Sequence, residues 1–166
     1  MRTLLIAGAF GIVVVSLAAC SGSGARSASE QALQRDADRW SIDKLEKNFH
    51  KATSKHDIDL MMSLWAPNAT LTIPGQTAVG RKQIRHYWLT KAKPFKPASR
   101  WISETPAYKI RISVNGDKGT LYFECHYVDL KTQKLLSHTA ADIEVARIGG
   151  RWLITSMVGG SAALSS

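Results

Sequence analysis

The sequence predicts an α+β domain in which a curved antiparallel sheet wraps around N-terminal helices, preceded by a signal peptide and a flexible tether. Apolar residues recur at helical spacing in the first half of the chain and alternate with polar residues in the second half. An apolar run that ends at Cys20 precedes both halves. Because the helices come before the strands, we expect them to cover one face of a single sheet.

The first twenty residues have the pattern of a secretory signal. Arg2 supplies a basic start, residues 4–19 form an apolar stretch, and small residues lead up to Cys20. The apolar stretch is shorter than the roughly 20 residues that a spanning helix needs. This favours a cleaved signal peptide over the alternative, a membrane anchor that is never cleaved.

Residues 17–20, Leu-Ala-Ala-Cys, resemble the lipobox of bacterial lipoproteins. The resemblance implies cleavage after residue 19, a diacylglyceryl group on the Cys20 thiol, and an acyl chain such as palmitate on the new amino terminus. It places the protein in the cell envelope, attached to a membrane through Cys20, and at the outer membrane if the organism has one. Residues 21–29 are rich in Gly and Ser, which is typical of a flexible tether.

These features divide the chain into three parts. Residues 1–19 are the signal peptide, residues 20–40 hold the lipidated cysteine, the tether and a possible helical arm, and residues 41–160 form the domain. Removal of the signal peptide deletes one charge, Arg2, so the formal net charge of +9 falls to +8. The basic excess favours anionic lipid or acidic envelope polymers as partners. An exported, lipid-anchored chain is not expected to bind nucleic acid.

Three helices are predicted in the first half. Ser27 and Glu30 have capping-box spacing and open a long amphipathic helix that runs to about residue 55. Alternatively, the helix of the domain starts at Ser41 and residues 29–40 form a separate arm. Asp57 is a suitable N-cap for a second helix, which the Pro-Asn pair at 67–68 ends. A third helix follows Gly80 and ends before the prolines at 94 and 97.

The remaining segments predict strands. Residues 69–73 form a short strand that ends at the turn pair Pro-Gly, 74–75. Residues 108–114 alternate between apolar and polar side chains, and Asn-Gly at 115–116 indicates a tight hairpin. Three further strands are expected over residues 119–130, 135–148 and 151–158. Cys125 falls in one of them and has no partner once Cys20 carries lipid, so it is expected to be a small buried apolar residue.

The order of these elements and several short motifs resemble the SnoaL-like branch of the nuclear transport factor 2-like superfamily. The motifs are DID at 57–59, LWAPNAT at 64–70, PG at 74–75, VGRKQI at 79–84 and GGRWLI at 149–154. The resemblance spans residues 41–158 and implies a cone-shaped domain around a pocket, with a homodimer formed through the outer sheet face in many members. Known functions in this superfamily range from isomerases, cyclases, dehydratases and epoxide hydrolases to non-catalytic binding domains, so the site must decide the function.

Steroid isomerases of this superfamily use a Tyr, a base Asp and a second, protonated Asp. In this sequence the Tyr position falls on Phe49 and the base position on Ile73. Phe has no donor and Ile has no proton acceptor, which excludes that chemistry. The late Asp position falls near Asp142 or Glu144, so an acidic group persists there without its partners.

Two predicted strands carry polar side chains along one face: Tyr122, Glu124 and His126 on one, and His138, Asp142 and Glu144 on the next. If that face lines the pocket, Glu124, His126 and Asp142 could perform general acid–base catalysis. Otherwise the apolar series of Leu121, Phe123, Cys125 and Tyr127 packs on the helices, and the polar face contacts water or a dimer partner. The sequence leaves both interpretations open.

Five residues are candidates for the pocket wall: Phe49, Trp65, Trp88, Tyr122 and Glu144. We expect no metal and no other cofactor, because the sequence has no His-x-x-x-His pair and no Cys/His cluster. The first hypothesis is a lipid-anchored envelope domain that binds a small apolar ligand or a protein partner without catalysis. The second is an acid–base enzyme, of isomerase, dehydratase or hydrolase type, that acts on a small organic substrate. The third is a structural dimer whose cavity is filled by side chains.

Overall fold

A computed structural model of the chain describes residues 27–161, so the predicted signal peptide, Cys20 and most of the tether lie outside the described residues. The helices are α1 (Ala28–Lys55), α2 (Ile58–Ser63) and α3 (Gly80–Thr90), with short 3-10 turns at Lys93–Phe95 and Ala107–Lys109. The strands are β1 (Trp65–Ile73), β2 (Gln76–Val79), β3 (Trp101–Glu104), β4 (Ile110–Asn115), β5 (Lys118–Asp129), β6 (Leu135–Ile148) and β7 (Arg151–Ser161).

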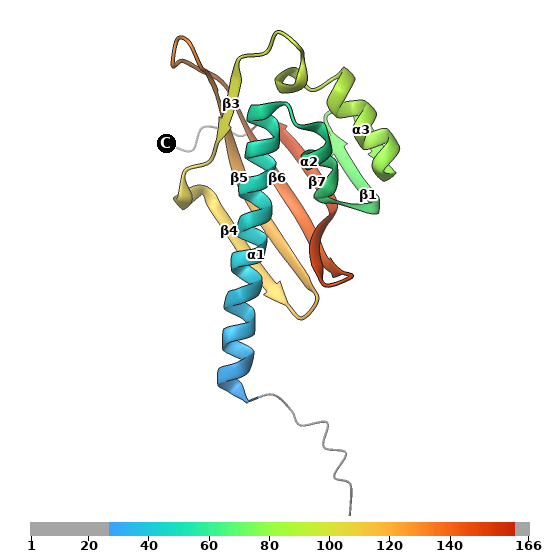
Figure 1. The fold of residues 1–166 in the computed structure, drawn as a ribbon, viewed down its shortest axis with the longest axis vertical. Helices are drawn as coiled ribbons and strands as arrows, with labels where there is room; N and C mark the ends of the chain where they lie inside the picture. Colours follow the sequence, from blue (N-terminus) through green and yellow to red (C-terminus); the bar gives the residue numbers. More distant parts are fainter. Residues whose placement is uncertain (1–26, 162–166) are drawn as a thin grey trace, which may run out of the picture.

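All of these strands belong to one curved sheet in the order β2-β1-β7-β6-β5-β3, and β4 pairs with β5 beyond the end of β3 (Figure 1). The α+β class is confirmed. The sheet is mixed rather than antiparallel throughout, because β1 runs parallel to β7. Short hairpins force consecutive strands to be antiparallel. The chain between β1 and β7 contains most of the other elements of the domain, so this pair is free of that constraint.

Helix α1 is continuous from Ala28 to Lys55, with no break at Ser41. The predicted capping box is present: the Glu30 amide donates to Ser27 Oγ over 3.2 Å, and the Ser27 amide donates to Glu30 Oε2 over 2.7 Å. Residues 28–37 have mostly exposed side chains and extend beyond the sheet (Figure 1). Packing begins at Asp38, whose buried carboxylate accepts from Arg147 over 2.6 Å and from Trp152 Nε1 over 3.3 Å.

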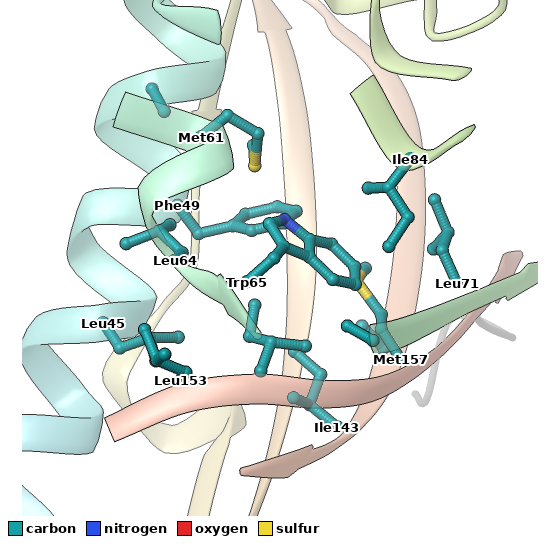
Figure 2. Close-up of a cluster of buried hydrophobic side chains, with 14 of the residues drawn as sticks. Leu45, Phe49, Met61, Leu64, Trp65, Leu71, Ile84, Ile143, Leu153 and Met157 are labelled. Carbon is teal, nitrogen blue, oxygen red and sulfur yellow. The ribbon is translucent and has the colours of Figure 1, made fainter. Parts of the chain in front are cut away.

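The three helices cover one face of the sheet, and the hydrophobic core lies between the helices and the sheet. Figure 2 shows the Trp65 indole at the centre, among side chains from the helices and the strands such as Phe49, Met61, Ile84 and Met157. None of the described helices is both long and apolar enough to cross a membrane.

Strand β5 settles which face is inward. Its apolar series, Leu121, Phe123, Cys125 and Tyr127, is buried with Ile143 and Val145 of β6 in the core under the helices. Because successive side chains point to opposite faces of a strand, the series that holds Glu124 lies on the outer face. Of the two interpretations left open by the sequence, the one based on hydrophobicity is therefore correct.

Candidate functional site

A cavity of about 480 Å³ lies between α3, the 3-10 turn at Lys93–Phe95, β3 and the inner face of the sheet. This volume falls within the range of about 300–1,000 Å³ that is typical of small-molecule sites. Its wall includes the following large side chains: Phe49, Tyr87, Trp88, Trp101, Tyr127 and Met157.

Aromatic side chains hold this wall in place by packing on one another. The Phe49 and Trp88 rings contact edge to face with centroids 5.5 Å apart. On the other side, the Trp101 and Tyr127 rings lie 5.4 Å apart. Separations of this size are favourable for aromatic pairs and add to the energy of burial. The cavity is therefore pre-formed and presents flat, apolar surfaces to a ligand.

The polar side chains of the cavity wall carry hydroxyls, two indole N–H groups, one thiol and two lysine ammonium groups. Burial raises the pKa of the Tyr87 phenol, and burial together with the neighbouring Cys125 raises the pKa of the Tyr127 phenol, so both stay neutral at physiological pH. Lys91 and Lys93 are exposed at the rim. Among the described residues, no Asp, Glu or His lines the cavity. The cavity can bind a ligand, but it lacks the carboxylate or imidazole that acid–base catalysis most often uses.

Two polar residues of α1, Glu46 and His50, are buried beside the cavity. His50 Nε2 lies 2.8 Å from Glu46 Oε1, and both side chains are almost fully buried. His50 Nε2 also contacts Thr105 Oγ1 at 2.7 Å, and His50 Nδ1 contacts Ser103 Oγ at 2.5 Å. The Glu46–His50 contact is an ion pair without hydrogen-bond alignment. Sequence analysis overlooked this pair, although the i,i+4 spacing of Glu46 and His50 on a helix indicates it.

These contacts determine the charge of His50. Burial by itself lowers the pKa of the imidazole, but the Cys125 sulfur and the Glu46 carboxylate outweigh it and raise the pKa to about 9. The Thr105 hydroxyl donates to the Glu124 carbonyl over 2.8 Å, so it accepts from His50 Nε2–H. The imidazolium compensates a carboxylate that would otherwise be buried without a positive partner.

The outer sheet face holds a polar cluster, which we define as Lys109, Tyr122, Glu124, His126 and His138. Glu124 Oε2 lies 2.7 Å from His138 Nε2 and 3.3 Å from Lys109 Nζ, and Tyr122 OH donates to Glu124 Oε1 over 2.9 Å. The site is shallow, but its neighbours cover Glu124, whose side chain is only 7% exposed. Burial opposes ionisation, yet hydrogen bonds from Tyr122, His138 and Lys109 hold the pKa of Glu124 below its usual value.

The two histidines of the polar cluster face each other. His126 of β5 and His138 of β6 are directly opposite in the register, and their rings meet edge to face with centroids 4.6 Å apart. Burial and the neighbouring His138 lower the pKa of His126. His126 is therefore neutral near pH 7 and its ring nitrogens include a free lone pair, because a neutral imidazole has one donor and one acceptor nitrogen.

The structure brings together two of the three predicted catalytic residues, Glu124 and His126, and adds His138 to them. Asp142 lies on the same face, opposite Tyr122, and its side chain is exposed. His138 belongs to the polar series of the sequence but is not among the predicted catalytic residues. Alternation indicates the face on which a side chain lies, whereas its neighbours on the next strand depend on the register.

The five predicted pocket residues divide into three groups. Phe49 and Trp88 line the cavity. Trp65 is fully buried in the core. Tyr122 and Glu144 are on the outer face, where they line a separate hollow with Asp142. Their expected place in the cone is wrong because their strands turn the apolar series inward.

Comparisons with known proteins agree with this architecture. The sequence profile of the SnoaL-like domain matches residues 34–158, and the chain belongs to this family. No curated protein matches the sequence.

Similar solved structures share the fold at low sequence identity. An NTF2-like protein with a cystatin-like fold from Novosphingobium aromaticivorans has a TM-score of 0.70 and 18% identity, over 86% of this chain and 95% of that one. The hexachlorocyclohexane dehydrochlorinase LinA-type3 from Novosphingobium barchaimii has a TM-score of 0.65 and 20% identity, over 81% and 92%. A protein with a cystatin-like fold from Nostoc punctiforme has a TM-score of 0.68 and 17% identity, over 77% and 93%.

Proposed function

We propose that this protein is a lipid-anchored domain of the cell envelope that binds a small, mainly apolar organic ligand with an anionic end in the cone cavity, without acid–base catalysis there. The observation that carries the proposal is the composition of the cavity wall. It combines aromatic faces with neutral hydroxyls, and the described residues place no carboxylate or imidazole in it.

The apolar part of the ligand follows from the depth of the cavity. Phe49, Trp88 and Tyr127 are almost fully buried in the wall. A ligand that removes its own apolar surface from water against such faces gains about 25 cal/mol for each Å² buried. A larger hollow of about 660 Å³ lies between α1 and the β4–β5 turn, but polar and charged side chains dominate its lining, so an apolar ligand fits the cone better.

The anionic end follows from the charge at the rim. Lys91 and Lys93 are the charged residues that line the cavity, and both have exposed ammonium groups near its edge. A carboxylate, sulfonate or phosphate at one end of the ligand would be stabilised there, while the aromatic wall holds the remainder. Because these lysines are exposed, their contribution decreases as salt concentration rises.

The location in the envelope rests on residues 1–20, which combine a signal peptide pattern with a lipobox-like Leu-Ala-Ala-Cys ending. A homodimer belongs to the same proposal. Native mass spectrometry of the full chain, extracted from membranes with mild detergent, can detect the lipid, the dimer and a bound ligand in one measurement. We expect the mass of a lipid on Cys20, the mass of a dimer, and a retained small molecule. An unmodified Cys20 would contradict the anchor.

Ligand binding in the cone can be tested with the anionic aromatic probe 8-anilinonaphthalene-1-sulfonate, whose emission reports burial. The variant Thr139→Phe places a large ring in the cavity and should weaken binding about tenfold or more, which corresponds to about 1.4 kcal/mol. The matched control is Thr120→Phe, the same change at an exposed position on the outer face, which should leave affinity unchanged. Equal loss in both variants, or loss in neither, would contradict binding in the cone.

A second pair of measurements tests the rim. The double variant Lys91→Gln, Lys93→Gln should weaken binding of the anionic probe several-fold, and the loss should shrink in high salt. Binding of a neutral aromatic probe, N-phenyl-1-naphthylamine, should stay the same. If both probes lose affinity equally, the lysines act on the shape of the cavity and not on the charge of the ligand.

A further inference from the structure

We propose that Glu124, His126 and His138 form a zinc-binding site on the outer face of the sheet, with the fourth position open to water. Each of the three side chains offers one ligand atom, and these atoms all lie within 4.8 Å of one another. This site is separate from the cone cavity, so it goes beyond the ligand binding proposed above.

The backbone places the three side chains on one surface. His126 and His138 are directly opposite on adjacent antiparallel strands. Cβ atoms of such pairs are about 4.5–5.5 Å apart, which suits two imidazoles that share a metal. Glu124 precedes His126 by two positions and therefore points to the same face.

The side chains need little movement to reach zinc geometry. Bonds of about 2.0–2.1 Å in a tetrahedron place neighbouring ligand atoms about 3.3 Å apart. Glu124 Oε2 and His138 Nε2 are now 2.7 Å apart and would separate slightly as zinc replaces the hydrogen bond between them. The widest separation of 4.8 Å would close by rotation of the side chains. His126 is only half-buried, so it has room for such a rotation.

The donor set fits zinc better than other common cations. Two imidazoles and one carboxylate, with a water in the fourth position, are a set that zinc enzymes use. Mg²⁺ and Ca²⁺ prefer oxygen ligands alone. The His138 side chain is 7% exposed, and its buried Nδ1 has no hydrogen-bond partner among the described residues. Zinc would bind the other nitrogen, Nε2, in place of the hydrogen bond to Glu124, and Nδ1 would then carry the ring proton without an outer-shell acceptor, which limits the affinity.

Two neighbouring residues have opposite effects on the affinity of the site for zinc. Tyr122 OH donates to Glu124 Oε1 and so orients the carboxylate with Oε2 toward the histidines, as outer-shell partners do in metal sites. The Lys109 ammonium lies 3.3 Å from Glu124 Oε2, and its positive charge opposes a second cation. We therefore expect zinc to bind at micromolar concentrations, and more tightly once the charge of Lys109 is removed.

Isothermal titration calorimetry with Zn²⁺ on the full chain, purified in mild detergent without a histidine tag, tests the proposal. We expect one Zn²⁺ per chain in this site and no binding of Mg²⁺. His126→Gln and His138→Gln should each weaken Zn²⁺ binding by more than about tenfold. The matched control is His86→Gln, a change at an exposed histidine on α3, which should have no effect. Lys109→Met should strengthen binding several-fold, which a purely structural ion pair does not predict.

The near-ultraviolet circular dichroism spectrum and the cooperativity of thermal unfolding show whether each variant remains folded. The Lys109→Met and His86→Gln variants retain all three ligands, so they keep the test informative if a ligand variant fails to fold. The proposal is overturned if the wild-type chain does not bind Zn²⁺ at micromolar concentrations. It is also overturned if a folded His126→Gln or His138→Gln variant binds as well as the wild type.

Discussion

Raising the pH should destabilise this fold through one buried residue, His50. Its imidazolium lies 2.8 Å from the Glu46 carboxylate and contacts the Ser103 and Thr105 hydroxyls. When the imidazolium loses its proton, the ion pair disappears and the buried carboxylate is left without a positive partner. Such a loss is costly because water cannot reach the site to compensate it.

The size of the effect follows from the pKa of His50, which burial lowers but the Cys125 sulfur and the Glu46 carboxylate together raise from 6.5 to about 9. A shift of one unit corresponds to 1.36 kcal/mol, so the protonated imidazole adds about 3 kcal/mol to the free energy of unfolding. Because the folded pKa is the higher one, this contribution is fully present below pH 6.5 and is lost as the pH rises through 9.

Urea unfolding, followed by tryptophan emission at pH 6, 8 and 10, measures the free energy of unfolding directly. We expect a decrease of about 3 kcal/mol between pH 6 and pH 10 in the wild type. His50→Gln, which keeps a side chain able to donate to Thr105, should be less stable at pH 6 and show a much smaller decrease. If the two proteins lose equal stability over this range, other groups cause the pH dependence and the reasoning about His50 is wrong.

Three further substitutions test a close backbone contact, its control and a buried hydrogen bond. Gly119→Ala would place a Cβ atom 2.7 Å from the Ser113 carbonyl oxygen and should lower the free energy of unfolding by about 1–3 kcal/mol. Gly160→Ala meets open space and should be nearly neutral when both variants are unfolded in urea, so equal losses would refute the steric argument. Asp38→Ala leaves the buried Trp152 indole N–H without its acceptor and should cost about 1–3 kcal/mol in chemical unfolding; an unchanged midpoint would contradict this role.

Local signals predicted most of the helices and strands. The capping box at Ser27 fixes the start of α1, and Asp57 caps α2 as expected, since its side chain accepts from the Leu60 amide over 2.8 Å. The end of α2 was placed too late because Trp65 continues the helical spacing of apolar residues, although it begins β1. Strand β3 was not predicted at all. It is four residues long, and a strand that short has almost no periodicity of its own.

The candidate site was predictable only in part. Alternation along β5 correctly placed Glu124 and His126 on one face. This face points outward because Leu121, Phe123 and Cys125 of the opposite face are buried. The hydrophobicity of those residues indicated this orientation, whereas the comparison with steroid isomerases favoured the opposite one. The contact between His126 and His138 depends on the register of two strands across a loop, and the sequence does not state that register.

The length of α1 bears on how a ligand reaches the cone. The helix starts at Ala28, eight positions after Cys20, and Phe49 of the cavity wall lies twenty-one positions further on. At 1.5 Å per residue, the start of the helix and the cavity are about 30 Å apart along the axis, roughly the thickness of the hydrocarbon layer of a bilayer. If Cys20 carries the proposed lipid anchor, α1 would hold the cavity away from the anchored end. The proposed ligand would then enter from the surrounding water rather than from the lipid.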